Sequence, residues 1–304
     1  MIKQTVGKSM QKVFLLVAML GVAGLEIVGQ EKSHFVVEDN DACDQIYFYL
    51  KSASGTCDIR TRSGKVPITI MGKSDPKYVS PEFGQDHKET TLKAWLTLHD
   101  KGEEGFSAKI SKLFGKKTTD NDNYWNIYLT NYKPYQLNLN YALGKSYVDL
   151  SNIAVEKLKI TSGNAHVKVG YHAKEGNRVE MDTFQVNVDL GDIEINQVNL
   201  AKAKVIMAEV GFGTLVLNFS KQPEVAAEIW AKVGAGSLEV DLPMESIPMI
   251  IFMKNTSYRK LHVPGDFKMV RENVYVSKAY DPDAVNLQTF NIDLSMGNVV
   301  FAEK

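Results

Sequence analysis

The sequence predicts an all-β protein: a solenoid-like stack of short strands with glycine corners, preceded by a β-rich but irregular N-terminal part. Two observations predict this fold class. Segments in which apolar and polar residues alternate, the pattern of a strand with one buried face, recur along the chain. Glycines recur just ahead of these segments, at spacings close to the length of one solenoid coil.

The first residues have the pattern of an export signal. Three lysines within the first twelve residues precede an uncharged apolar run of 13 residues, Val13–Leu25. A membrane-spanning helix needs roughly 20 such residues. We therefore predict that residues 1–29 are a signal peptide cleaved after Gly29; the alternative is an uncleaved anchor that tolerates Glu26. No second apolar run is long enough to span a bilayer, so we expect no transmembrane span in the mature chain.

Length and composition suit a globular protein with a large core. Of the 304 residues, 44% are hydrophobic and 23% are charged, which allows one or two domains. The formal net charge is −1, and removal of residues 1–29 leaves 32 basic and 35 acidic residues, a net charge of −3. This balance gives no indication of a nucleic-acid partner.

The two cysteines, Cys43 and Cys57, both belong to the mature chain. Export to an oxidising compartment predicts a disulfide between them, which would stabilise the fold by roughly 3 kcal/mol. The alternative is a pair of buried thiols. A catalytic thiol is not expected, because no nearby histidine is marked out as its base.

The repeat begins at six glycines, which are predicted to be structural corners: Gly144, Gly163, Gly191, Gly213, Gly236 and Gly297. In five of the six, apolar residues follow at the second and fourth positions after the glycine; after Gly144 they begin two positions later. A glycine at such an entry allows either a positive φ or a close approach of neighbouring backbone.

Successive glycine spacings are 19, 28, 22, 23 and 61 residues. The longest interval contains a degenerate unit in which Arg259 stands where glycine would. Gly55, followed by Cys57 and Ile59, obeys the same rule much earlier in the chain. The predicted organisation is a β-rich N-terminal region over residues 30–132 and a solenoid domain over residues 133–304. The early unit at Gly55 leaves open whether the N-terminal region is a separate domain or the start of the same stack.

From Lys133 to Phe301 the sequence resembles a bacterial family pattern. The segments VDLGDIEI, VGFGTLVLNF, VGAGSLEVDLP and SMGNVVF, and the link over Leu150–Ile160, resemble the toast-rack family. They are also similar to the C-terminal domain of cell-wall-active antibiotic response proteins and to adhesin β-solenoids. Two features depart from the pattern: a signal peptide replaces the several membrane spans of stress-sensing relatives, and ALGKS, DLGDI and SMGNV lack the second glycine.

The resemblance implies a bacterial envelope protein, in the periplasm or at the cell surface, and it supplies no catalytic residues. We therefore expect a non-enzymatic protein without a cofactor, which binds a protein, glycan or cell-wall partner through an adhesin-like surface. Two alternatives stay open: a periplasmic component of an envelope-stress sensing system, and a carbohydrate-active enzyme.

No catalytic, cofactor-binding or metal-binding residue is predicted. The pairs Gly211-x-Gly213 and Gly234-x-Gly236 lack the third glycine of a nucleotide-binding loop and precede strands, so we interpret them as corners.

The histidines form no tight metal-ligand spacing, and a solvated pair is favoured over a metal site for His166 and His172. Acidic clusters at residues 39–41, 120–122 and 281–283 could offer oxygens to Ca²⁺, but none has the full EF-hand pattern.

Five outward positions could form a polar ladder if the coils stack in register: Asp149, Lys168, Glu194, Glu239 and His262. A carbohydrate-active enzyme would need paired carboxylates on such a face, and a solvated sheet face is the alternative. Tyrosines concentrate between Tyr47 and Tyr141, where either ligand binding or packing explains them.

Overall fold

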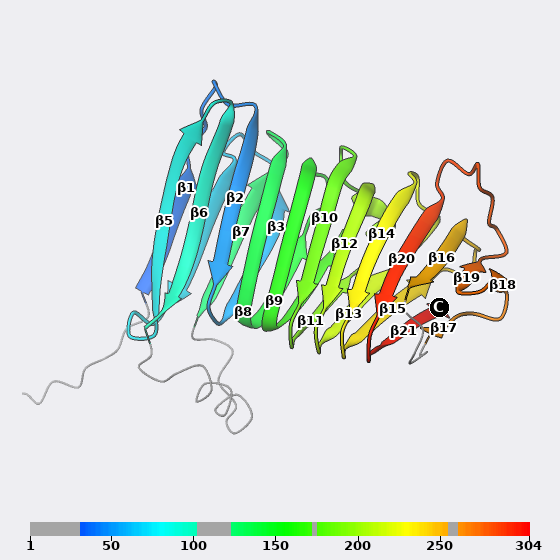
Figure 1. The fold of residues 1–304 in the computed structure, drawn as a ribbon. Coiled ribbons are helices and arrows are strands. Elements are labelled where there is room, and N and C mark those ends of the chain that lie inside the picture. Colours follow the sequence, from blue (N-terminus) through cyan, green and yellow to red (C-terminus); the bar gives the residue numbers. More distant parts are fainter. Residues whose placement is uncertain (1–30, 102–122, 172–174, 255–260) are drawn as a thin grey trace, which may run out of the picture.

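The computed structural model describes residues 31–101, 123–171, 175–254 and 261–304 (Figure 1). They form 21 β-strands and one short 3-10 helix, η1 (Val198–Ala201), so the predicted all-β class is confirmed. Within these ranges, no helix is long and apolar enough to cross a membrane. The predicted signal peptide and Arg259 lie outside the described residues.

The strands form one open sheet that bends along a line of corners into two layers, and β8 (Tyr135–Asp149) and β9 (Val155–Gly170) run through both. Layer I contains, in spatial order, β5 (Val79–Lys88), β6 (Thr91–Asp100), β2 (Gln45–Ser52), the first parts of β8 and β9, β10 (Met181–Val188), β12 (Ala203–Val210), β14 (Ala227–Val233), β20 (Gln288–Leu294), β16 (Met249–Lys254), β19 (Val274–Val276) and β18 (Lys268–Arg271). Layer II contains β1 (Glu31–Val37), β4 (Ile68–Ser74), β7 (Tyr124–Thr130), β3 (Thr56–Arg62), the second parts of β8 and β9, β11 (Asp192–Ile195), β13 (Thr214–Asn218), β15 (Ser237–Leu242), β21 (Asn298–Glu303) and β17 (Leu261–His262).

Neighbouring coils pair in parallel, as in a solenoid, and antiparallel pairs occur at the two ends of the stack. At one end these are β1–β4, β4–β7 and β5–β6, and at the other they are β16–β19 and β18–β19. The ends of the stack therefore differ from its repeating coils, as is usual for the terminal units of a solenoid.

The coils do not stack in sequence order. The last coil of the chain, β20–β21, lies between β14–β15 and β16–β17. At the other end, the first coil, β2–β3, lies between β6–β7 and β8 (Figure 1). Both chain ends therefore contribute coils that are covered on both sides.

The core lies between the two layers and is filled by every second residue of most strands. Ile193, Leu215 and Leu238 are fully buried and stand one above the other in β11, β13 and β15. One continuous cluster of buried side chains extends from Val37 to Phe301. It includes residues from both predicted regions, and the boundary at residue 132 stays a prediction.

At most of the corner glycines the structural reason is close approach rather than a positive φ. Of the six, Gly144 alone has a φ in the left-handed region, 104°. A Cβ on Gly213 would lie 1.9 Å from the carbonyl oxygen of Gly191, and a Cβ on Gly297 would lie 2.0 Å from that of Gly236. At these corners, the glycine of one coil thus lies against the corner carbonyl of the neighbouring coil.

Candidate ligand-binding surface

The outer face of layer I carries a shallow groove over β10, β12, β14, β20 and β16, which lie side by side in Figure 1. Its volume is about 600 Å³, which is within the usual range of small-ligand sites. Outward-facing apolar side chains in it belong to Met207, Trp230 and Phe252, and polar ones belong to Gln185 and Asn291.

The strand register places these five residues in one row. Gln185, Met207, Trp230, Asn291 and Phe252 are successive Cα partners from β10 to β16. Neighbouring strands lie about 4.8 Å apart, so the backbones at Trp230 and Phe252 are roughly 10 Å apart. Met207 and Trp230 are 46% and 50% exposed, although their strands are in the middle of the layer.

The segment IPMIIFM is almost continuously apolar, which is typical of a strand covered on both sides, yet only one face of β16 is fully buried. Met249 and Ile251 of β16 are fully buried, whereas Ile250 and Phe252 are partly exposed. One face of β16 packs on the core and the other belongs to the groove face.

Neighbouring groups fix the two aromatic rings of the groove. The indole Nε1 of Trp230 donates a hydrogen bond to Oε2 of Glu228, at 3.3 Å. The guanidinium of Arg271 lies 5.9 Å from the ring centroid of Phe252. Held rings lose little conformational freedom when a ligand stacks on them.

The charges beside the row compensate one another. Glu209, Lys232, Asp293 and Lys254 follow each other across β12, β14, β20 and β16, two positions along the strands from the aromatic row. Lys232 Nζ lies 3.6 Å from Glu209 Oε1, and Lys254 Nζ lies 3.9 Å from Asp293 Oδ2. The groove therefore has polar walls without a net charge.

Four of the five predicted ladder residues do share a row, on layer II: Lys168, Glu194, Glu239 and His262. Asp149 does not belong to it, because Tyr147 is the partner of Lys168 in β8. Asp149 is 8% exposed and accepts hydrogen bonds from the N–H and the hydroxyl of Ser151, at 2.9 and 2.5 Å.

This layer II row is on the opposite layer from the groove, and one of its two carboxylates, Glu194, is held in an ion pair. Lys168 Nζ lies 2.8 Å from Glu194 Oε2. This hydrogen bond, together with one from Asn196, lowers the pKa of the Glu194 carboxyl. A glycosidase acid needs a raised pKa, so Glu194 is suited to an ion pair and not to proton donation.

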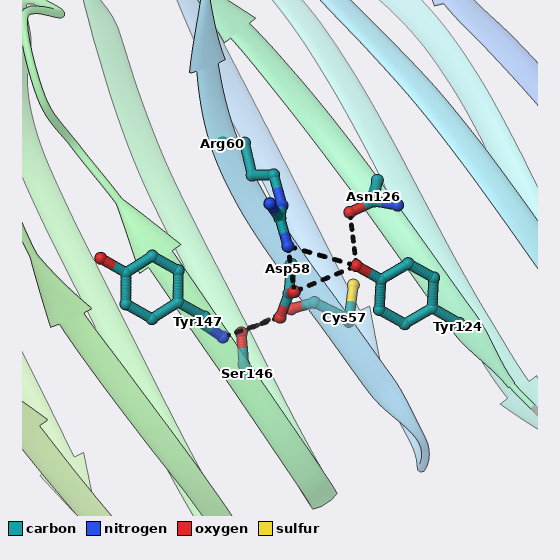
Figure 2. A network of polar contacts seen from close by, with 7 residues as sticks. All are labelled: Cys57, Asp58, Arg60, Tyr124, Asn126, Ser146 and Tyr147. Atoms are coloured by element: carbon teal, nitrogen blue, oxygen red, sulfur yellow. Dashed lines mark hydrogen bonds and ion pairs between the residues drawn. The ribbon is translucent and has the colours of Figure 1, made fainter. Parts of the chain in front are cut away.

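The densest polar network joins β3, β7 and β8 around Asp58 (Figure 2). Asp58 is 7% exposed; its Oδ2 accepts from Arg60, at 3.2 Å, and lies 3.3 Å from the Tyr124 hydroxyl. Its Oδ1 accepts from the backbone N–H of Tyr147, at 2.9 Å. Every contact is internal to the layer, so the network ties three strands together.

The structure contains no Cys43–Cys57 disulfide: both residues are buried free thiols. Cys43 precedes β2 and Cys57 follows it, and this eight-residue strand extends roughly 26 Å. A disulfide joins Cα atoms at most about 7 Å apart. Burial raises the pKa of the Cys57 thiol, which keeps it protonated and unreactive.

Free thiols give a direct prediction for the purified mature protein. Alkylation under denaturing, non-reducing conditions is expected to modify both cysteines, and intact mass measures this. A reduced sample is the control and should have the same mass. A non-reduced protein that gains no alkyl group while the reduced control gains two would contradict the structure.

The described residues contain no group of three or more His, Cys, Asp or Glu placed to hold a metal ion. His166 Nδ1 lies 2.7 Å from Asp192 Oδ2 in an exposed pair. Asp39 pairs with Lys133, and Asp281 accepts from the backbone of Asp283. His172 and the acidic cluster at 120–122 lie outside the described residues.

A second apolar surface is convex rather than concave. Leu190, Phe212 and Met296 stand at three corners and are 54%, 73% and 66% exposed. Phe212 thus supplies an exposed aromatic side chain outside the groove.

Comparison with known proteins identifies a family. Residues 29–191, more than half of the chain, match the family described as the N-terminal domain of toast_rack. The match begins well ahead of Lys133, where the sequence resemblance was expected to start. No curated protein matches the sequence.

Three solved structures are among those that match the chain over most of its length. A "putative cell adhesion protein" of Clostridium sporogenes is 16% identical with a TM-score of 0.44, over 90% of this chain and 100% of that one. A "putative adhesin" of Bacteroides fragilis is 10% identical with a TM-score of 0.35, over 90% and 97%. A "putative lipid binding protein" of Parabacteroides distasonis is 11% identical with a TM-score of 0.33, over 90% and 97%.

Proposed function

This chain belongs to the toast-rack family, and we propose that it is a non-enzymatic protein of the bacterial envelope, exported to the periplasm or cell surface, that binds its partner on the outer face of layer I. The half-exposed Trp230 at the centre of a groove of about 600 Å³ carries this proposal. Large aromatic side chains held in concave sites are where binding energy concentrates. Met207 and Phe252 extend the apolar surface on either side.

The groove favours binding over catalysis. Its two carboxylates, Glu209 and Asp293, are each close to a lysine. The described residues that line it include no histidine, serine or cysteine, so a hydroxyl or thiol nucleophile with an imidazole base is lacking there. A cleft lined by Asp149, Glu194 and Glu239 would favour a carbohydrate-active enzyme, but Asp149 is buried and accepts hydrogen bonds from Ser151. An envelope-stress role would differ in having a signalling protein as its partner, and adjacent kinase or sigma-factor genes would favour it.

Binding of the fluorescently labelled mature chain to isolated envelope material tests the proposal. Trp230→Ala is expected to weaken binding about 10-fold or more, because it removes the central stacking surface. Phe212→Ala removes an exposed aromatic ring from a corner and is the matched control, with unchanged binding expected. Equal affinities of wild type and Trp230→Ala would refute the assignment of the groove.

A further inference from the structure

The side chains of the groove indicate which chemical class of ligand it binds. This inference rests on the proposed function. We propose that the ligand is an uncharged glycan chain that lies across the strands of layer I, with one sugar ring stacked on Trp230.

The main chain of the groove is fully engaged. β14 is hydrogen-bonded to β12 on one side and to β20 on the other, and β20 is bonded in turn to β16. A peptide that binds by strand addition needs a free sheet edge, and the middle of layer I has none. The ligand therefore meets side chains only.

The charge of the groove excludes a polyanion as the preferred ligand. Phosphate-rich or polyuronate chains are bound by unpaired lysines and arginines. Here Lys232 and Lys254 are close to Glu209 and Asp293, so carboxylates alternate with ammonium groups along the wall. An anionic chain would be repelled by the carboxylates at every second strand.

An uncharged sugar fits the aromatic and amide side chains of the groove. A pyranose has an apolar C–H face that stacks on an aromatic ring, and a rim of hydroxyls that donate and accept hydrogen bonds. Trp230 supplies the ring, held by the hydrogen bond from its Nε1 to Glu228. Gln185, Asn187 and Asn291 supply amides, each of which can both donate and accept.

The row of side chains that contains Trp230 indicates the direction in which the glycan chain lies. Trp230 and Phe252 are separated by two strand spacings, roughly 10 Å, along the axis of the stack. The same row continues toward the N-terminal end through the Cα partners Lys159, Asn138, Tyr49 and Trp95. Aromatic residues thus occur at both ends of a polar row that crosses nine strands, about 38 Å in length. A linear chain of several sugars fits this row better than a single sugar.

Isothermal titration of the mature chain tests the proposal. The probes are linear oligosaccharides of glucose, mannose, galactose, xylose and N-acetylglucosamine in α and β linkage and of increasing length, with polygalacturonate as the anionic probe. At least one uncharged series is expected to bind, with affinity that rises with chain length. Trp230→Ala should weaken this binding about 10-fold or more, Trp230→Phe should retain part of it, and Phe212→Ala should leave it unchanged.

The outcomes separate this inference from the proposed function. Failure of every uncharged series, or tighter binding of polygalacturonate, overturns the glycan assignment. If envelope binding still depends on Trp230 in that case, the proposed function stands with a different ligand. If envelope binding is also insensitive to Trp230→Ala, both are overturned. Oligosaccharide binding that is unaffected by Trp230→Ala places the glycan elsewhere and overturns the inference.

Discussion

Gly213→Ala is expected to destabilise the protein by more than about 2 kcal/mol, because one added carbon atom has no room at the corner. The new Cβ would lie 1.9 Å from the carbonyl oxygen of Gly191. That oxygen accepts a hydrogen bond from the N–H of Thr214, at 3.1 Å, so moving it away breaks the link between two coils. Urea-induced unfolding of the mature chain measures the change.

Two further variants show which property of glycine matters. Gly265→Ala is the matched control, since its Cβ would meet no atom within 4 Å, and its stability should be close to that of wild type. Gly213→Asn distinguishes close approach from backbone strain. Asparagine tolerates a positive φ but still carries a Cβ, so it should be at least as destabilising as alanine. Wild-type stability of Gly213→Ala would show that the coils are not in this contact.

Asn177→Ala is expected to lower the free energy of unfolding by about 3 kcal/mol or more, because the Asn177 amide joins the backbone at the start of β9 to the backbone at the end of η1. Its Oδ1 accepts from the N–H of Val155, at 2.8 Å, and its Nδ2 donates to the carbonyls of Val155 and Ala201, at 2.7 and 3.3 Å. The residue is 2% exposed, so water does not easily replace these bonds.

The control for Asn177→Ala is Asn164→Ala, at a partly exposed position of β9, and a change below about 0.5 kcal/mol is expected there. The same unfolding measurement serves both variants. If the two alanine variants are equally stable, the Asn177 amide does not bridge the coils.

Local alternation was enough to predict the strands, because one buried face per strand is a property of a few consecutive residues. Ile193 and Ile195, like Leu215 and Leu217, are buried as their distance from the preceding glycine predicts. The reason for those glycines was less accessible from the sequence. Whether a corner needs a positive φ, a close approach or both depends on the neighbouring coil, and the structure gives both at Gly144 and close approach alone at Gly213.

The order of the coils could not be read from spacing. Gly236 and Gly297 are 61 residues apart in sequence, yet their corners are in contact, because β16–β17 lies beyond β20–β21. Strands with the same alternation of apolar and polar residues look alike in sequence, so the sequence does not show which strands pair. The packing of the folded protein determines the pairs.

The groove was missed for the same reason, although one signal was present. In AEIWAKV, the alternation places Ala227, Ile229 and Ala231 inward and leaves Trp230 on the polar face. A tryptophan at an outward position of the alternation indicates a role at the protein surface. Its proximity to Phe252 depends on β20 lying between β14 and β16, which the sequence does not disclose.

Quenching of tryptophan fluorescence by acrylamide tests most directly whether the partner covers the Trp230 face. Of the three tryptophans, Trp125 is fully buried, Trp95 is partly exposed and Trp230 is half exposed. Saturating envelope ligand is expected to abolish the difference in quenching between the wild-type protein and the Trp230→Phe variant, both measured with ligand present. Binding that leaves the quenching of Trp230 unchanged would contradict the account.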